Sequence, residues 1–155
     1  MFARPARAPR YGHGVDIHRL GQGDEDRVIG AAHLFDAPPT AEWTLLFLAR
    51  EGHHLLVAAD GGEDVGFVTG VETVHPDKGA EMFVYELGVD DHHRGRGIGR
   101  ALVQALAEVA RERGCYGMWV LTDTDNHAAL ATYQSAGSSP PRPQVMLDWE
   151  LRPQT

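Results

Sequence analysis

The sequence predicts an α/β (α+β) fold, and three observations lead to this prediction. An apolar stretch at residues 84–89 runs into a turn rich in glycine and arginine, and a strongly amphipathic segment follows at 98–113. The stretch ends the last of three apolar runs separated by short turn sequences, a pattern typical of antiparallel strands. Helical periodicity appears both before and after these runs. At 155 residues, the chain has the length of one domain with a single substantial core.

The elements follow in the order strand, helix, helix, three strands, helix, strand, helix, strand. Strands are expected where apolar residues alternate or run between turn residues, at 14–20, 54–59, 65–74, 82–89, 117–121 and 145–151. Helices are expected where apolar residues recur every three or four positions, at 24–35, 41–50, 98–113 and 128–136. Thr40, and Asp125 or Asn126, fit as helix N-caps, while Gly114 and Gly137 fit as helix stops.

The run at residues 82–89 differs from the other strands because both of its faces are largely apolar. This pattern is typical of a central strand that is buried on two sides. The last strand, at 145–151, follows three prolines that exclude regular structure at 140–143.

The charge distribution separates one basic segment from an acidic remainder. Fourteen basic residues stand against 22 acidic ones, for a net charge of −8, yet five arginines fall within residues 94–113. General nucleic-acid binding needs an extended positive face, so this class of function is excluded. The basic segment suits an anionic cofactor, and the acidic remainder suits either a cationic substrate or solubility alone.

The chain shows no feature of a membrane or secreted protein. No apolar run reaches membrane-spanning length, so no membrane partner is expected. The single Cys115 excludes an intramolecular disulfide and fits a reducing cytoplasm. Residues 1–12 carry arginine and proline without a signal-peptide core, and we expect a disordered basic arm before a single domain at 13–152. The nine histidines form no metal-ligand pattern, so no metal is expected.

The turn at residues 94–100 has the chemistry of a phosphate-binding loop. Gly95, Gly97 and Gly99 have no Cβ atoms, so the backbone N–H groups at the start of the helix can approach phosphate oxygens closely. Three arginines add charged donors, namely Arg94, Arg96 and Arg100. The spacing is neither the dinucleotide fingerprint nor a Walker A loop. The alternative is a glycine-rich turn whose arginines face solvent.

The spacing Arg94-x-x-Gly97-x-Gly99 resembles the coenzyme A motif of the GNAT N-acetyltransferases, Arg/Gln-x-x-Gly-x-Gly/Ala. The order of elements is similar to that family from residue 15 to residue 151. The resemblance implies a GNAT fold, with a mixed, mostly antiparallel central sheet flanked by helices on both faces, and acetyl-CoA as co-substrate. It also implies a set of coenzyme-binding residues: Leu87, Gly88, Val89, Arg94, Gly95, Arg96, Gly97, Ile98, Gly99, Arg100 and Asn126. Members of the family are often dimers, so a homodimer is an expectation.

Four shorter stretches, at residues 85–89, 123–125, 129–133 and 145–148, resemble a narrower group, the aminoglycoside 3-N-acetyltransferases of the small GNAT type. This resemblance implies an aminoglycoside acceptor, acetylated at its 3-amine. The residues expected to contact the acceptor are Tyr85, Glu86, Asp123, Asp125 and Asp148. Two alternatives stay open: acetylation of another small amine, an amino acid or a protein N-terminus, and a degenerate coenzyme A-binding module without turnover.

Acetyl transfer to an amine requires a neutral amine, donors for the oxyanion and a proton for the thiolate. Glu86 is the one carboxylate in the apolar part of its strand, where partial burial would suit it as general base. The resemblance implies that Tyr133 is the general acid and that backbone N–H groups around residues 87–89 meet the carbonyl. The alternatives are a Glu86 held by an arginine and a Tyr133 in the core. The aromatic residue usual in the family after Gly137 is missing here.

Overall fold

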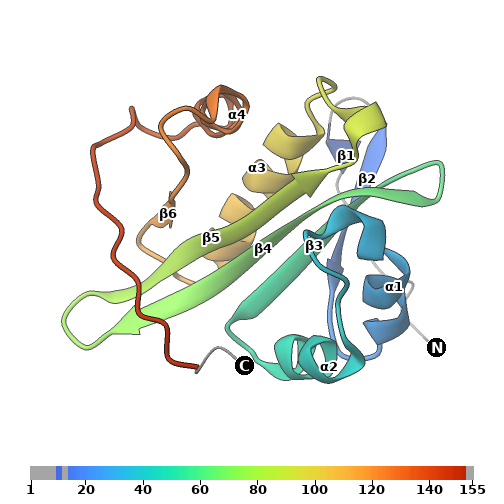
Figure 1. Cartoon of the computed structure of the whole chain (residues 1–155), viewed down its shortest axis with the longest axis horizontal. Coiled ribbons are helices and arrows are strands. Elements are labelled where there is room, and N and C mark those ends of the chain that lie inside the picture. Colours follow the sequence, from blue (N-terminus) through green and yellow to red (C-terminus); the bar gives the residue numbers. More distant parts are fainter. Residues whose placement is uncertain (1–9, 12–13, 153–155) are drawn as a thin grey trace.

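Six strands form one sheet in the order β1-β2-β3-β4-β5-β6, in a computed structural model that describes residues 10–11 and 14–152 (Figure 1). The strands are β1 (Arg10–Tyr11), β2 (Val15–Leu20), β3 (His53–Asp60), β4 (Glu63–His75), β5 (Gly79–Val89) and β6 (Met118–Val120). Neighbouring strands are antiparallel except β5 and β6, which are parallel. The predicted mixed, mostly antiparallel sheet is therefore confirmed.

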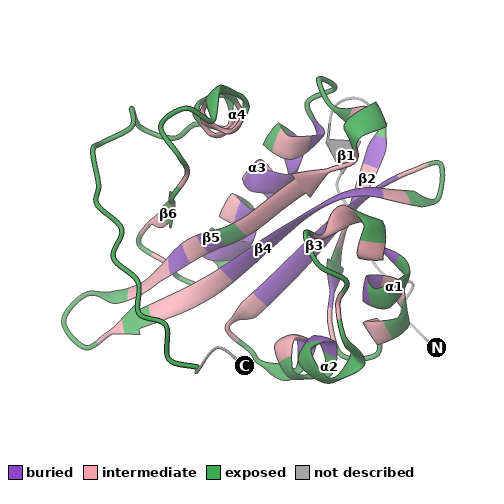
Figure 2. Cartoon of the chain, viewed as in Figure 1, coloured by how far each residue is buried: buried purple, intermediate pink, exposed green. Residues whose placement is uncertain are grey.

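Helices cover both faces of the sheet. They are α1 (Glu25–Gly30), α2 (Ala41–Ala49), α3 (Ile98–Glu112) and α4 (His127–Ser135), with short 3₁₀ turns η1 (Ala32–Leu34) and η2 (Asp91–His93). Helices α1 and α2 lie on one face of the sheet, and α3 lies on the other (Figure 1). The larger core cluster joins α3 to the sheet through residues such as Leu102 and Leu106, and a smaller cluster lies under α1 and α2 (Figure 2).

Local capping explains where the helices begin. The Thr40 hydroxyl accepts a hydrogen bond from the Trp43 N–H (3.3 Å) and starts α2, as the sequence predicts. The helix expected at residues 24–35 is shorter, because α1 ends at Gly30 and a 3₁₀ turn follows. Glycine is a poor helix former, and the Ala31 N–H is shared between the carbonyls of Arg27 and Val28, which tightens the chain into that turn.

The prediction that β5 is buried on both faces is wrong. Met82 and Val84 face α3 and are buried, whereas Phe83 on the opposite face is half-buried and Tyr85 is exposed. Helices α1 and α2 lie mainly over β2, β3 and β4, so they leave this face of β5 open (Figure 1). The aromatic residues there form a row, in which Phe83 stacks on Trp119 with ring centroids 4.3 Å apart and meets Tyr85 edge-on at 5.9 Å.

The strand expected at residues 145–151 does not form. These residues pair with no strand of the described chain and leave their large apolar side chains in solvent (Figure 2). Their sequence alternates as a strand should, but a strand needs a hydrogen-bonded neighbour, and the segment before it is held by Pro140, Pro141 and Pro143. At the other end, Arg10 and Tyr11 form β1, and the rest of the arm expected at residues 1–12 lies outside the described residues.

A network of charged side chains ties the sheet to the C-terminal end of α3. His54 is 1% exposed, its Nδ1 accepts a hydrogen bond from Arg19 (2.9 Å), and its Nε2 donates to Glu72 (2.7 Å). Glu72 also accepts from Arg113. Burial alone would raise the pKa of Glu72, but the hydrogen bonds from Arg113 and His54 outweigh it and lower that pKa. Burial lowers the pKa of His54, and an Nδ1 that accepts a hydrogen bond from Arg19 belongs to a neutral imidazole.

We expect Glu72→Ala to lower the free energy of unfolding by about 2–4 kcal/mol, because it leaves the buried His54 N–H without an acceptor and Arg113 without its main partner. Urea unfolding followed by circular dichroism measures this change. The matched control is Glu51→Ala, since Glu51 also accepts from Arg113 but is 86% exposed. Its effect should stay within about 0.5 kcal/mol. Equal losses in the two variants would contradict the structural role of the network.

Candidate active site

A β-bulge in β5 decides which side chains face the open side of the sheet. Thr69 pairs with Glu86 and Gly70 with Val84, which leaves Tyr85 as the extra residue. The Thr69 hydroxyl accepts a hydrogen bond from the Glu86 N–H (3.1 Å), which holds the bulge in place.

Alternation along β5 places Glu86 on the face opposite α3. Leu87 and Val89 pack against the cluster under α3, whereas a Cβ on Gly88 would meet Phe67 and the Leu34 carbonyl on the other face. Because successive side chains alternate, Glu86 lies on the same side as Gly88. The bulge adds one residue, so Phe83, Tyr85 and Glu86 all lie on this side, which we call the acceptor face.

The edge of β5 next to β6 is open beyond the bulge. Pairing between the two parallel strands ends at Val84 and Val120. The N–H groups of Glu86 and Asp90 point toward β4, where they bond to Thr69 and to the Val65 carbonyl (2.8 Å). By alternation, the N–H groups of Leu87 and Val89 point to the open edge. Two donors on a free strand edge can stabilise an oxyanion.

The glycine-rich turn leads from this edge into α3. Gly97 is the N-cap of α3 and has a left-handed backbone, with φ of 76°. The first bond of the helix runs from the Ala101 N–H to the Gly97 carbonyl (3.0 Å), so the preceding N–H groups in the first turn have no partner within the helix. A helix start with free N–H groups is a good site for a phosphate. The residues present therefore fit the pyrophosphate of coenzyme A.

Two arginines of the turn are held at its rim by surface ion pairs. Arg94 pairs with Asp91 (3.0 Å) and donates to the Val89 carbonyl (3.3 Å), and Arg96 pairs with Asp60 (3.0 Å). Both guanidinium groups remain accessible, with 70% and 41% of their side chains exposed. Exposed ion pairs contribute little free energy, so exchange of a carboxylate for a phosphate partner costs little.

We expect Gly97→Val to weaken binding of acetyl-CoA by at least tenfold, because a β-branched residue is strained at positive φ and would distort the N–H groups of the turn. Isothermal titration calorimetry with acetyl-CoA measures the affinity. Arg96→Ala is the control and should cost less, since it leaves the backbone donors in place. Wild-type affinity in Gly97→Val, together with a native circular dichroism spectrum, would contradict coenzyme binding at this turn.

Glu86 has the surroundings that a general base needs. Its side chain is half-buried, and burial followed by the nearby charge of Asp36 raises its pKa. No arginine pairs with Glu86 among the described residues, so the alternative in which an arginine holds this carboxylate does not apply. No local sequence signal selects Asp36, because it lies in the loop between η1 and α2, and only the fold brings that loop next to β5.

Tyr133 lies on the inner side of α4 and packs against the core cluster under α3. Burial raises the pKa of its hydroxyl, which favours the protonated form that a proton donor requires. The helix can come close to α3 because position 99 is a glycine: a Cβ there would lie 3.1 Å from the methyl group of Thr132. Tyr133 is therefore a half-buried residue on a helix that packs at the start of α3.

Asn126 begins α4 as its N-cap, with its side-chain oxygen accepting from the Ala129 N–H (3.1 Å). This cap uses the amide oxygen and leaves the amide nitrogen as the group that could meet a ligand.

Four of the residues predicted to contact the acceptor are exposed: Tyr85 on the acceptor face, Asp123 and Asp125 between β6 and α4, and Asp148 in the C-terminal segment. The carboxylates of these three aspartates make no ion pair within the described part of the chain.

Two negative findings concern the described residues alone. No helix there is both long and apolar enough to cross a membrane. Within residues 10–11 and 14–152, no three His, Cys, Asp or Glu side chains are grouped as a metal site would require.

A bulged strand with a free edge, a glycine-rich turn and a helix start that fits a pyrophosphate together describe a coenzyme A-dependent transferase. Comparison with known families matches residues 30–137 to the acetyltransferase (GNAT) family. The match covers most of the chain, and the protein therefore belongs to this family, whose members use acetyl-CoA.

Individual proteins extend this result. The chain is 32% identical over 129 residues to an L-2,4-diaminobutyric acid acetyltransferase of Streptomyces coelicolor, covering 82% of this chain and 69% of that protein. It is 39% identical over 90 residues to the N-alpha-acetyltransferase RimI of Mycobacterium tuberculosis, covering 58% of this chain and 54% of RimI. The chain spans only about a third to a half of the length of the first curated relatives it matches.

A solved structure shares the fold over nearly its whole length. The aminoglycoside acetyltransferase meta-AAC0020, from an uncultured soil metagenomic sample and in complex with sisomicin, superimposes with a TM-score of 0.82. The alignment covers 89% of this chain and 97% of the other, at 22% identity. At this identity the likeness establishes the fold alone.

Proposed function

We propose that this protein transfers the acetyl group of acetyl-CoA to an amine of an aminoglycoside, the 3-amine by the narrower resemblance, in a single ternary complex. The observation that carries the proposal is the position of Glu86: a half-buried carboxylate on the acceptor face, directly before the two N–H groups at the open edge of β5. In this arrangement a base and an oxyanion site lie on consecutive residues of one strand.

The chemistry follows from these positions. Glu86 removes a proton from the ammonium group of the acceptor, directly or through water, and the neutral nitrogen attacks the thioester carbonyl. The N–H groups of Leu87 and Val89 stabilise the oxyanion that forms. As the C–S bond breaks, the nitrogen releases its second proton to solvent, and Tyr133 donates a proton to the thiolate and regains one from solvent. Glu86 then releases the proton it took up, so the products are an amide, free coenzyme A and one proton in solution.

Charge supports a cationic acceptor. The chain carries a net charge of −8 although three of its arginines lie in the turn at residues 94–100, and Glu86 has Asp36 as a charged neighbour. Asp123, Asp125 and Asp148 add accessible carboxylates without cationic partners among the described residues. A polyamine needs several carboxylates, because each ammonium group gains little at an exposed site. Use of acetyl-CoA and a single cysteine fit a cytoplasmic location.

A second acceptor class is favoured by the relatives. RimI and the diaminobutyric acid acetyltransferase are more similar in sequence than meta-AAC0020 is, and their names indicate a protein N-terminus and a small diamine. Both acceptors present a single reacting ammonium group with few further positive charges. An aminoglycoside therefore needs more carboxylates at its binding site than either of these acceptors does.

The deciding experiment is a thiol-release assay with acetyl-CoA and four amines: sisomicin, kanamycin, L-2,4-diaminobutyrate and a peptide with a free N-terminal alanine. We expect release with the aminoglycosides and a product 42 Da heavier by mass spectrometry, in which NMR identifies the acetylated amine. Release with only the diamine or the peptide would show that the acceptor is that amine and not an aminoglycoside. Binding of acetyl-CoA without release for any amine would identify a coenzyme-binding module.

We expect Asp125→Asn to raise KM for the aminoglycoside several-fold, because it removes one carboxylate from a site that holds several ammonium groups. KM for acetyl-CoA should stay unchanged, since Asp125 lies outside the glycine-rich turn. Initial rates at varied concentrations of each substrate measure both constants. Asp77→Asn, at an exposed turn between β4 and β5, is the control. Parallel changes in both constants would place Asp125 in the coenzyme site.

A further inference from the structure

The hairpin between β3 and β4 reaches across to the glycine-rich turn. Asp60 ends β3 and pairs with Glu63, so Gly61 and Gly62 alone form the loop of the hairpin. Both glycines have positive φ angles, 58° and 88°, which is the geometry of a tight type I′ turn. The Asp60 carboxylate accepts a hydrogen bond from the guanidinium of Arg96 (3.0 Å), which lies 36 residues further along the chain. The tip of one hairpin therefore supplies an anion to the glycine-rich turn.

The base of this hairpin is tied to two neighbouring elements. Arg27 of α1 donates two hydrogen bonds, 3.1 and 2.7 Å long, to the carboxylate of Asp64 at the start of β4. Only 15% of the Asp64 side chain is exposed, so this pair is partly shielded from water. The Asp90 N–H, directly after β5, donates to the Val65 carbonyl (2.8 Å). These bonds fix the hairpin next to the segment that leads into the glycine-rich turn, and the position of Asp60 follows from them.

The ion pair of Asp60 with Arg96 is better shielded than the other ion pair of the turn. The carboxylate partner of Arg94 is Asp91, whose side chain is 83% exposed, whereas the side chain of Asp60 is 34% exposed. Solvent and salt weaken an exposed pair more than a partly buried one. Asp60 is therefore the carboxylate that holds an arginine of the turn more firmly.

Arg96 is also the arginine closest to the start of the helix, since it directly precedes Gly97, the N-cap of α3. A phosphate on the N–H groups of the first helical turn would lie beside its side chain. The guanidinium has five N–H donors and gives one of them, on Nη1, to Asp60. Because arginine can bind phosphate through two parallel hydrogen bonds, phosphate is a stronger partner than a carboxylate held by one. Arg96 can therefore exchange Asp60 for a phosphate.

We propose that Asp60 is a positioning residue that occupies Arg96 in the free protein and gives it up to a phosphate of the coenzyme. Binding then costs the free energy of the ion pair, so Asp60 lowers the affinity for acetyl-CoA and for coenzyme A alike. The pair forms again when the product leaves, which favours release of coenzyme A after each turnover. This inference rests on the proposed binding of the coenzyme at the glycine-rich turn, and it does not depend on the acceptor.

Isothermal titration calorimetry of the full chain with acetyl-CoA tests the sign of the effect. Asp60→Asn removes the charge and keeps the shape of the side chain, and we expect binding about threefold to fivefold tighter than in the wild type. Asp60→Ala also removes the acceptor atom and should gain at least as much. A residue with only a structural role would give the opposite sign, because damage to the turn weakens binding. Unchanged or weaker binding in either variant would overturn the proposal.

Arg96→Ala shows whether Asp60 acts through this arginine. In the Arg96→Ala background, Asp60→Asn should lose most of its effect on the affinity for acetyl-CoA, because the group that Asp60 occupies is gone. The titrations are made at an ionic strength of about 0.15 M, where exposed charges more than about 8 Å apart are largely screened. A gain of the same size in both backgrounds would overturn the proposal.

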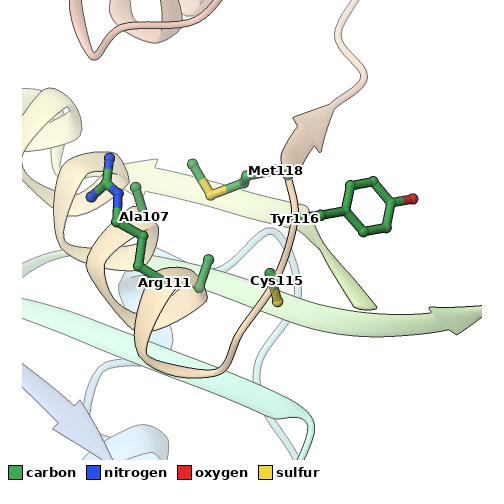
Figure 3. A pocket seen from close by; sticks show the side chains of 7 residues that line it. Ala107, Arg111, Cys115, Tyr116 and Met118 are labelled. Atoms are coloured by element: carbon green, nitrogen blue, oxygen red, sulfur yellow. The ribbon is translucent and has the colours of Figure 1, made fainter. Parts of the chain in front are cut away.

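Two other carboxylates provide matched controls for the change in net charge. Glu63→Gln removes a charge from the same hairpin, at the exposed position opposite Asp60. Glu108→Gln removes the acceptor of a hydrogen bond from Arg111 (2.6 Å), near the far end of α3, where Arg111 lines an open cavity of about 170 Å³ (Figure 3). This arginine lies about 20 Å along the helix from its start, at a rise of about 1.5 Å per residue. Both controls should keep the wild-type affinity, and a gain in Glu63→Gln equal to that in Asp60→Asn would overturn the proposal.

Titration with coenzyme A completes the test. Acetyl-CoA and coenzyme A carry the same phosphates, so Asp60→Asn should tighten the binding of both by the same factor, and a gain for acetyl-CoA alone would overturn the proposal. Gly97→Val separates this inference from the coenzyme site on which it rests. If Gly97→Val weakens binding and Asp60→Asn leaves it unchanged, the role of Asp60 is wrong and the coenzyme site stands. If both variants keep the wild-type affinity, the coenzyme binds elsewhere and both proposals are wrong.

Discussion

Glu86→Gln is expected to lower kcat by about 10²–10⁴-fold, the usual contribution of a general base, while the protein stays folded and binds acetyl-CoA normally. The reason is that glutamine keeps the shape of the side chain but cannot accept a proton. Steady-state rates with the aminoglycoside and calorimetry with acetyl-CoA measure the two effects separately. Full activity in this variant would show that Glu86 is not the general base.

The pH profile adds a test of the same residue. A base must be deprotonated, so kcat/KM falls as the pH drops through its pKa. Burial and Asp36 raise the pKa of Glu86, so the acidic limb should lie above the ordinary range of a glutamate. Asp36→Asn removes one cause of the shift and should move this limb to lower pH without a large loss of kcat at its plateau. If the acidic limb does not move in Asp36→Asn, it reports the titration of a group other than Glu86.

Local sequence signals predicted the framework of the site well. The glycine-rich turn, the start of α3 and the N-caps at Thr40 and Asn126 depend on residues close together in the chain, and the structure has them where the sequence indicates. The GNAT family, which the same motif and the order of the elements suggest, is confirmed by the family match over residues 30–137. Short-range geometry is therefore enough to place the glycine-rich turn at the start of α3.

The remaining features depend on residues far apart in the chain. The bulge at Tyr85 arises from the register between β4 and β5, and Asp36 comes next to Glu86 only when its loop packs over the sheet. The segment at 145–151 has the alternation of a strand, but strand formation also requires a partner edge. Alternation within one segment cannot supply that edge.

Stability should also depend on pH through the network around His54. Because burial lowers the pKa of His54, the unfolded chain takes up a proton below about pH 6.5 before the folded protein does. Glu72, whose pKa is lowered in the folded protein, gives stability that is lost as the pH falls below its unfolded value. Both groups therefore act in the same direction and weaken the fold in acid. Measurements of kcat/KM below pH 6 therefore need a parallel measurement, such as circular dichroism, that shows the protein is still folded.

Tyr133→Phe is the second change with a large expected effect. Within the described residues the Tyr133 hydroxyl makes no hydrogen bond, so its removal should cost little stability, and the ring still fills its place against the core cluster. We expect kcat to fall by about 10²–10⁴-fold, because the thiolate would leave without a proton donor. Affinity for acetyl-CoA should stay within twofold, as measured by calorimetry.

The controls for Tyr133 separate chemistry from product release and from packing. Tyr116→Phe removes a hydroxyl that donates to Glu81 (2.9 Å) at an exposed position and should leave kcat unchanged. Burial raises the pKa of Tyr133 above its usual value near 10, so the acid stays protonated and no alkaline limb from it should appear at neutral pH. Single-turnover kinetics isolate the chemical step from release of coenzyme A. An unchanged single-turnover rate in Tyr133→Phe would show that the thiolate takes its proton from water, because the only group removed is the phenol oxygen.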